Sequence, residues 1–376
     1  MDSIEILKHL IEIDTTNPPG NERNAAVYLS QLLEPYGFVC EIQELGDNRA
    51  NFIASLGIKS VPELVMNGHL DVVPATGEWK TEPFRLSSHG KRLYGRGTSD
   101  MKGGIAAMCE AAIRIAKSGG PVHGKLKLLF VADEECSNLG TESYLKKFAP
   151  GDYVVIGEPT LLKVAVAHRG VSRDYIDFKG KARHAALLSE EESSIEQTAK
   201  AIVAVKKINE KLQTWSHEVL PPPSIAITML KAYEKDNIIP AVSRLLLDFR
   251  ILPGMDKEKV YELLDQGFAE AGLGNYEKIP HFYMPGGEIS IEDPFVKLCL
   301  KEREKVLGDR VEPCAFEASC EQCFFTERGA KAVICGPGDI SQAHTLNEYI
   351  EEQQVRQAAD LYESIMKWVL IEENIE

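Results

Sequence analysis

The chain has 376 residues, of which 44% are hydrophobic and 26% charged, and this is the composition of a globular protein long enough for two domains. Its 57 acidic and 42 basic side chains give a formal net charge of −15. Nucleic acid is not expected as a partner, because phosphate binding needs a basic surface. No apolar run reaches the length of a membrane span, and residues 1–5 lack a basic start, so we expect a cytoplasmic protein with no membrane partner.

Eight cysteines are spread along the chain, which does not indicate a disulfide scaffold in a protein of this length. Cys320 and Cys323 form the one closely spaced pair, and Cys314 lies nearby in the sequence. A structural zinc site would need a second pair at matching spacing, and the sequence has none. Buried thiols are therefore favoured over a metal or redox role for these cysteines.

The N-terminal part predicts two amphipathic helices followed by three strands. The helices are expected at 2–13 and 22–36, and the strands at 39–43, 51–56 and 64–67. Two prolines and a glycine at 18–20 prevent the first helix from continuing. This succession of helices and strands is typical of an α/β sheet.

His69 and Asp71 follow directly on the third of these strands. Residues two apart share a face on extended backbone, so both side chains can point the same way. The arrangement suits a metal-binding imidazole whose other ring nitrogen donates to a carboxylate. Without further signals, a His-x-Asp pair is more often an ordinary surface or core pair.

Further acidic residues follow a glycine-rich turn and two more apolar strands. Asp100 lies in the turn just before a helix expected at 105–116. The buried strand 126–131 runs into Asp133, Glu134 and Glu135, where ligand sites of open α/β sheets are found. Adjacent glutamates on irregular backbone point in different directions, so one can bind a metal while the other handles a proton. The alternative is a solvated acidic turn. Another strand begins at 153 and ends in Glu158.

The pattern changes near residue 172 to a β-α-β-β-α-β order, which is the ferredoxin-like motif. Its strands are expected at 175–178, 224–230, 244–251 and 276–282, and its helices at 194–212 and 257–268. The α/β pattern then resumes with helix 294–306, strand 331–335 and a final helix at 353–371. Between the last two, the Gly-Pro-Gly sequence at 336–338 can offer backbone N–H groups to an anionic or carbonyl oxygen, and His344 follows it.

The segments 64–74, 94–104, 132–135 and 336–348 together resemble the acetylornithine deacetylase and succinyl-diaminopimelate desuccinylase family of two-zinc amidohydrolases and carboxypeptidases. The resemblance implies an α/β zinc-hydrolase catalytic domain with a mixed central sheet flanked by helices. It also implies an inserted ferredoxin-like α+β domain that serves as a lid and dimerisation surface. The catalytic domain would comprise 1–171 and 284–376, and the inserted domain 172–283.

The resemblance also assigns roles to individual residues. The metal ligands would be His69, Asp100, Glu135, Glu158 and His344, with Asp100 bridging two metals. The catalytic residues would be Glu134 as general base, Asp71, and His184 as a lid residue that stabilises the reacting oxygen. The substrate-binding residues would be Arg169, Asn237, Arg250 and Gly336, with the two arginines suited to a carboxylate.

From these residues we expect a metal-dependent hydrolase that cleaves the amide bond of an N-acyl amino acid. The enzyme would use two divalent metal ions, zinc first and cobalt or manganese as alternatives, to activate a water for which Glu134 is the base. The substrate would be a small N-acyl amino acid or a short peptide, and the enzyme a homodimer through its inserted domain. A dipeptidase or carboxypeptidase of the same family is the alternative, and an inactive binding homologue is a weaker one.

Overall fold

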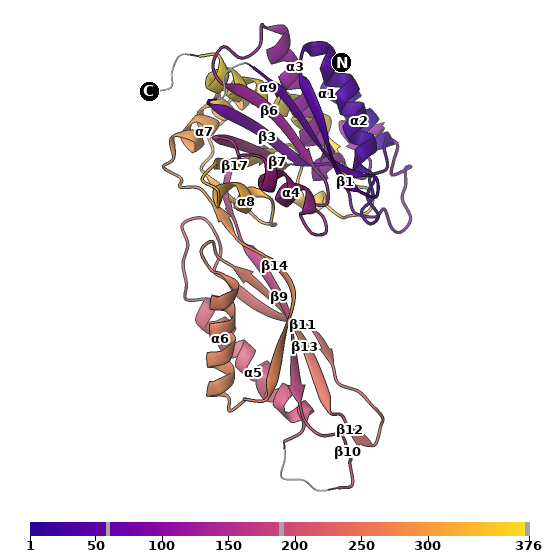
Figure 1. Ribbon diagram of the computed structural model, residues 1–376, viewed down its shortest axis with the longest axis vertical. Helices are drawn as coiled ribbons and strands as arrows, with labels where there is room; N and C mark the ends of the chain where they lie inside the picture. The colour runs from indigo at the N-terminus through magenta and orange to yellow at the C-terminus, as the bar shows by residue number, and fades with distance from the viewer. Residues whose placement is uncertain (58–60, 188–191, 373–376) are drawn as a thin grey trace. The chain divides into compact units, whose positions relative to one another are not determined.

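The computed structural model describes residues 1–57, 61–187 and 192–372. These residues form two compact units, each with its own sheet (Figure 1). Unit 1 comprises residues 1–167 and 288–376, and unit 2 comprises residues 168–287. No helix in the described ranges combines the length and the apolar character that crossing a bilayer requires.

Unit 1 is built on a nine-stranded mixed sheet with the order β1-β2-β6-β3-β7-β17-β8-β15, and β16 pairs with β8. Its strands are β1 Val39–Gly46, β2 Arg49–Leu56, β3 Glu63–His69, β6 Lys125–Val131, β7 Tyr153–Pro159, β8 Ala165–His168, β15 Gly287–Glu288, β16 Cys314–Phe316 and β17 Lys331–Gly336. The four central strands β6, β3, β7 and β17 are parallel. Their carboxyl ends therefore meet at one edge of the sheet, where ligand sites of such sheets lie.

Helices cover both faces of this sheet. They are α1 Ser3–Glu12, α2 Glu22–Leu33, α3 Gly103–Lys117, α4 Leu139–Lys147, α7 Pro294–Leu307, α8 Gln322–Thr326 and α9 Glu352–Leu370. Val65 of β3 packs in one apolar cluster with Tyr144 of α4 and Phe325 of α8. Its neighbours Leu64 and Met66 point to the opposite face, because side chains alternate along a strand. Helices α3 and α9 contact β3 there (Figure 1).

A second, three-stranded sheet in unit 1 joins distant parts of the chain. It has the order β18-β5-β4, from β4 Ser87–His89, β5 Arg92–Tyr94 and β18 Tyr349–Glu351. Tyr349 pairs with Tyr94 in antiparallel register. The segment that follows His344 is thereby held beside the glycine-rich turn that carries Asp100.

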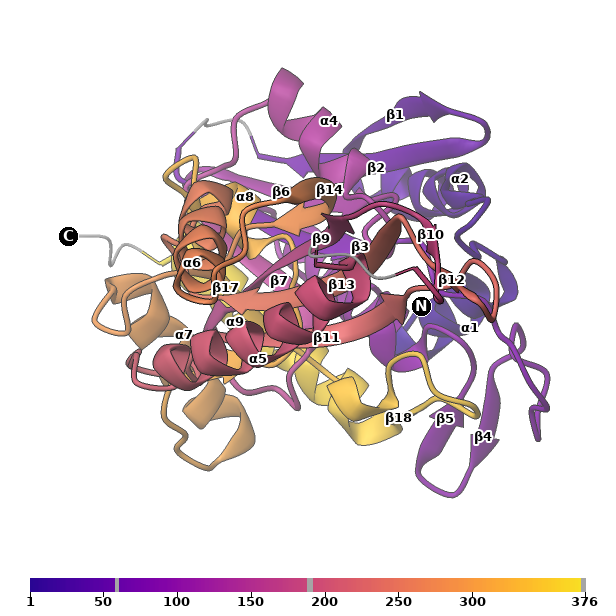
Figure 2. The same ribbon diagram turned by 90° about the horizontal axis from the view of Figure 1, so that it is seen from below.

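Unit 2 has the β-α-β-β-α-β order, and its main sheet has the strand order β11-β13-β9-β14. Its elements are β9 Gly170–Lys179, α5 Ser194–Leu212, β11 Ser224–Lys231, β13 Val242–Ile251, α6 Lys257–Glu270 and β14 Tyr276–Met284. Both helices cover the same face of the sheet (Figure 2), where Phe268 of α6 packs edge-on against Phe178 of β9. A two-stranded sheet of β10 Arg183–His184 and β12 Ile238–Ile239 completes the unit.

The mixed α/β fold expected from the sequence is confirmed, and the differences lie in short elements. The helix expected at 22–36 ends as an α-helix at Leu33 and continues as a 3-10 turn over Glu34–Tyr36, because Pro35 lacks the N–H that the α-helix needs. The sequence analysis did not predict helices α4 and α8 or strands β4, β5, β8, β10, β12, β15, β16 and β18. They are short and carry little periodic pattern, so tertiary contacts decide them.

Candidate metal centre

The two carboxylate oxygens of Asp100 face two different imidazoles. Oδ1 lies 3.0 Å from Nε2 of His69, which ends strand β3. Oδ2 lies 3.5 Å from Nε2 of His344, which lies in the loop after β17. The His69 side chain is 1% exposed and that of His344 is 54% exposed, so the centre is closed on one side and open on the other. Asp100 is thus placed to bridge two positions.

Each imidazole has a second carboxylate beside it. Glu158, near the end of β7, has Oε1 at 3.6 Å from Nε2 of His69. Glu135, in the turn after β6, has Oε2 at 3.0 Å from Nε2 of His344. The structure therefore brings together all five predicted ligands as two sets, each with one imidazole, one carboxylate of its own and one oxygen of Asp100.

The cluster has too little positive charge for its acids. Burial raises the pKa of Glu158 well above its ordinary value and that of Glu135 above its own, and in both the charge of Asp100 adds to the rise. Bonds to Asp100 and Glu135 raise the pKa of His344 to about 10. Burial lowers the pKa of His69, but Asp100 and Glu158 more than offset this and raise it well above 6.5. Two divalent cations on these nitrogen and oxygen donors would supply the missing charge, so the residues present fit a dinuclear site.

The carboxylate of Asp71 holds the acidic turn, and the ring of His69 contacts the backbone oxygen of Asp71 instead, which corrects the expectation for this pair. Nδ1 of His69 lies 3.0 Å from the backbone oxygen of Asp71 but 3.7 Å from its carboxylate. The carboxylate instead accepts the backbone N–H groups of Glu134 at 3.1 Å and Glu135 at 3.2 Å. The strand of His69 and the turn after β6 are thereby fastened together.

Two groups that sequence reasoning missed support this turn. The Asn17 amide donates to Asp71 at 2.8 Å and to Asp133 at 2.9 Å, and Asp133 also accepts from Arg49 at 2.7 Å. Asp133 has a φ of 69°, a left-handed conformation that is uncommon outside glycine and asparagine. The Asn-Pro-Pro-Gly sequence at 17–20 indicated a turn but not this contact, because the partners are distant in the sequence.

Glu348 fixes the loop that carries Asp100 and was also missed. Its buried carboxylate accepts the backbone N–H groups of Gly97 at 2.8 Å, Ser99 at 2.8 Å and Asp100 at 3.1 Å. The Arg96 guanidinium donates to the same carboxylate at 2.7 Å. Burial raises the pKa of Glu348 to about 7. Its place at the end of the 336–348 segment was the one available signal.

Glu134 lies at the centre without belonging to either set. Asp100, Glu134, Glu135, Glu158 and His344 all line one cavity of about 240 Å³ in unit 1. Burial raises the pKa of Glu134 well above its usual range, and neighbouring carboxylates add to this rise. Oxygens of Glu134, Glu158 and a further glutamate, Glu321, lie within 4.8 Å of one another.

The backbone N–H of Gly336 is not free to bind substrate, so the expectation for this residue is wrong. Its N–H donates to the Thr160 hydroxyl at 3.1 Å, and the N–H of Gly338 donates to Gln354 at 2.8 Å. A Cβ on Gly336 would lie 2.1 Å from the backbone oxygen of Gly157. Glycine is required here for the close approach of β17 to β7, beside Glu158.

The other predicted substrate residues and His184 belong to unit 2. His184 and Asn237 are brought together, with the Asn237 amide 3.2 Å from Nε2 of His184, and both side chains are exposed. Burial lowers the pKa of Arg169, and the charge of the nearby Arg250 lowers it further. Arg250 donates to Asp248 at 2.8 Å.

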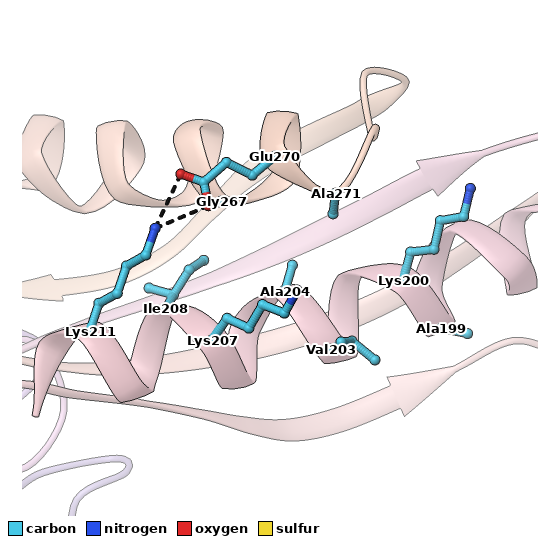
Figure 3. Close-up of a pocket in the computed structure, with 10 residues that line it drawn as sticks. All are labelled: Ala199, Lys200, Val203, Ala204, Lys207, Ile208, Lys211, Gly267, Glu270 and Ala271. Atoms are coloured by element: carbon cyan, nitrogen blue, oxygen red, sulfur yellow. Dashed lines mark hydrogen bonds and ion pairs between the residues drawn. The ribbon is translucent and has the colours of Figure 1, made fainter.

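A separate hollow in unit 2 lies between α5 and α6, where Lys211 pairs with Glu270 at 3.0 Å (Figure 3). Val203, Ala204 and Ile208 form its apolar floor along α5. None of the ten residues drawn there is a predicted site residue. The five predicted metal ligands and Glu134 all lie in unit 1.

Comparison with known proteins decides the family. Residues 65–368 match the family model described as peptidase family M20/M25/M40. The chain belongs to this family. It is 30% identical to an acetylornithine deacetylase of Proteus mirabilis in an alignment 365 residues long, and the alignment covers 93% of this chain and 92% of the relative. Membership in the M20/M25/M40 family makes the protein a metal-dependent hydrolase.

Solved structures show the same fold. An M20 family metallo-carboxypeptidase, Sso-CP2 from Sulfolobus solfataricus, has a TM-score of 0.78 at 21% identity, covering 98% of this chain and 99% of that one. The YxeP protein of Bacillus subtilis, described as a dinuclear metal-binding peptidase of the M20 family, has a TM-score of 0.70 at 16% identity. The match covers 98% of this chain and 97% of the YxeP chain. These M20 members share the fold of the present chain across both units.

Proposed function

We propose that this chain hydrolyses the amide bond of an N-acyl amino acid, in the manner of an acetylornithine deacetylase or a succinyl-diaminopimelate desuccinylase. The observation that carries the proposal is Asp100, whose two oxygens face His69 and His344, each with a second carboxylate beside it. Similarity to an acetylornithine deacetylase over 93% of the chain supports the choice of reaction.

In this proposal His69, Glu158 and Asp100 hold one divalent cation, and His344, Glu135 and Asp100 hold the other. Zinc suits the mixture of imidazole and carboxylate ligands, and cobalt or manganese could take its place. When bound, such a pair of cations lowers the pKa of a water and polarises a carbonyl group.

Glu134 is the proposed general base. A carboxylate in this cavity can take the proton of the attacking water and return it to the leaving nitrogen, which completes hydrolysis. Glu134 lines the same cavity as the proposed ligands Asp100, Glu135, Glu158 and His344 and belongs to neither ligand set, which leaves its carboxylate available for this role. Asp71 would keep Glu134 and Glu135 in place through their backbone N–H groups.

Unit 2 is proposed to complete the site as a lid. His184 and Asn237, which contact one another, would donate to the oxygen of the reacting carbonyl. Arg169 and Arg250 would bind the substrate carboxylate, since two neighbouring guanidinium groups attract an anion. Gly336 is no longer among the proposed substrate contacts, because its N–H is already paired.

Unit 2 is also the proposed surface of a homodimer. Strand β11 is an edge strand, and its Met229 and Leu230 are 36% and 53% exposed. An exposed apolar edge favours antiparallel pairing with the same edge of a second copy. Leu230→Lys should therefore give a monomer in light-scattering measurements, whereas Val122→Lys, an exposed apolar site in unit 1, should not change the mass. A dimer that persists in Leu230→Lys would rule out this edge.

A substrate panel tests the proposed reaction. The zinc-loaded protein is given N-acetyl amino acids, N-succinyl amino acids and dipeptides, and released amine is measured alongside metal content. Deacylation with two bound ions per chain supports the proposal. Preferential dipeptide cleavage would replace it with the dipeptidase alternative, and ligand binding without turnover would indicate an inactive homologue.

A cytoplasmic location remains a prediction. All eight cysteines of the chain are thiols in the structure, which accords with a reducing compartment. Cys320 and Cys323 are fully buried, and burial raises the pKa of both thiols well above the usual value. They are therefore poorly suited to redox exchange, as expected of structural thiols.

A further inference from the structure

Glu321 is a buried carboxylate that the five proposed ligands and Glu134 leave without a role. Its exposure is 0%, and neither side-chain oxygen has a hydrogen-bond partner within residues 1–57, 61–187 and 192–372. Buried polar groups are almost always paired, and an unpaired buried charge is strongly unfavourable. This carboxylate therefore requires a partner that the described protein groups do not provide.

The backbone around Glu321 is fixed to neighbouring strands. The Gln322 amide donates to the backbone oxygens of Val166 at 3.2 Å and Ala332 at 2.8 Å, which fastens the start of α8 to β8 and β17. The backbone oxygen of Glu321 accepts the N–H of Phe324 at 3.0 Å. These bonds hold the backbone of Glu321 in place, and its carboxylate is fully buried there.

That position is beside the half of the centre that contains His69. Oxygens of Glu321, Glu134 and Glu158 lie within 4.8 Å of one another, and Glu158 is 3.6 Å from Nε2 of His69. Three carboxylates thus converge beside a single imidazole. One imidazole cannot balance three acids, whereas a divalent cation suits an oxygen-rich position of this kind.

We infer that Glu321 helps to hold the cation on the His69 side of the centre, as a sixth side chain beyond the five proposed ligands. The inference rests on the metal centre of the proposed function. It assigns a metal-holding role to a residue of the loop between β16 and α8, far in sequence from the other members. Glu321 acts on the cation in this account, either in direct contact or through one water.

Zinc binding to the Glu321→Gln variant tests the inference without any substrate. Metal is removed from wild type and variant with a chelator, and zinc affinity and stoichiometry are measured by competition with a chromophoric chelator. Thermal unfolding is recorded with and without zinc. Glu317→Gln, which neutralises an exposed glutamate of the same segment, is the matched control. Glu321→Asp keeps the carboxylate but moves it one methylene group back from the centre, and it is the second variant if Glu321→Gln does not fold.

We expect Glu321→Gln to bind one of the two zinc ions at least 10-fold more weakly, the scale seen when groups around a metal site are removed. Its metal-free form should unfold at the same or a higher temperature, because an unpaired charge has been removed. Equal zinc affinity in the variant and the wild type would overturn this inference and leave the proposed centre standing. A metal-free variant that melts at a lower temperature but binds zinc with unchanged affinity would do the same. Wild type that binds no zinc would overturn the proposed centre as well.

Discussion

At the scale of single residues, the carboxylate of Asp71 determines where both glutamates of the acidic turn lie. It accepts the N–H groups of Glu134 and Glu135, and Asn17 holds it from the other side at 2.8 Å. A change at Asp71 would therefore displace the proposed base and a proposed ligand together. The contact with His69 runs through the backbone oxygen and would remain available.

Replacing Glu134 separates metal binding from proton transfer. Because Glu134 belongs to neither ligand set, Glu134→Ala should retain two cations per chain. Its turnover should fall by about 10²- to 10⁴-fold, the usual contribution of a general base. Steady-state rates and metal content of the same preparation check this. Cys136→Ala, at an exposed position two residues away, is the control, and unchanged turnover in Glu134→Ala would remove Glu134 from the mechanism.

His168 should make the protein sensitive to acid. Burial lowers the pKa of His168 to about 4, and its Nε2 has no partner in the described chain. An unfolded chain takes up this proton near pH 6.5, so stability is lost as pH falls from 6.5 toward 4. Between pH 7.5 and 5 this amounts to about 2 kcal/mol of unfolding free energy.

The variant His168→Gln isolates this effect, because glutamine does not titrate. Urea unfolding at both pH values should show that the stability difference between wild type and His168→Gln shrinks by about 2 kcal/mol at the lower pH. The exposed His89→Gln provides the reference for an imidazole on the surface. A difference that stays constant with pH would show that His168 takes up its proton as readily in the folded protein as in the unfolded chain.

At the scale of elements, the centre depends on how closely its strands and helix approach. A Cβ on Gly104 of α3 would lie 2.4 Å from the backbone oxygen of Gly157, and one on Gly336 of β17 would lie 2.1 Å from the same atom. Glycines on two elements thus allow both to contact β7 directly before Glu158. The position of Glu158 relative to His69 follows from this packing.

Gly336→Ala should disturb stability and the centre together. The added methyl group would force β17 away from β7, and overpacking of this kind costs about 1–3 kcal/mol or more. Urea unfolding and zinc affinity should both weaken. Gly274→Ala, where an added Cβ meets nothing within 4 Å, is the control and should leave both unchanged. Normal zinc affinity in Gly336→Ala would mean that Glu158 tolerates the shift.

At the scale of the whole molecule, the acids of the centre are one part of a strongly acidic chain. The net charge is −15, and burial raises the pKa of Glu134, Glu135 and Glu158. A carboxylate with a raised pKa in the folded state contributes stability at low pH and loses it as pH rises. The raised pKa of His344, about 10, acts in the same direction.

Metal removal should therefore destabilise the protein, and more so at pH 8 than at pH 6. Each bound cation adds about 2.7 kcal/mol to the unfolding free energy when its free concentration is 100 times its dissociation constant. Higher pH strengthens cation binding, since the ligands must be deprotonated. Melting temperatures measured with zinc and with a chelator at both pH values check this. A chelator effect that is absent, or larger at pH 6, would contradict it.

Much of the fold could be predicted, because it follows from local patterns, whereas the roles of the candidate ligands came from the family resemblance and remain predictions. Apolar runs predicted the strands. Polar residues that follow these runs, such as His69 and Glu135, predicted the edge of the sheet at which the candidate site lies. The parallel order of β6, β3, β7 and β17 then brings the ends of these strands together.

The sequence by itself thus determined the succession of elements and which residue types gather at the strand ends. Only the tertiary structure decided which polar groups are already paired. The carboxylate of Asp71 holds a backbone turn, and the N–H of Gly336 is occupied. Glu321 is buried beside Glu158 with no hydrogen-bond partner among the described residues. Hydrogen bonds between residues far apart in the chain leave no periodic signal, because each depends on how whole elements pack.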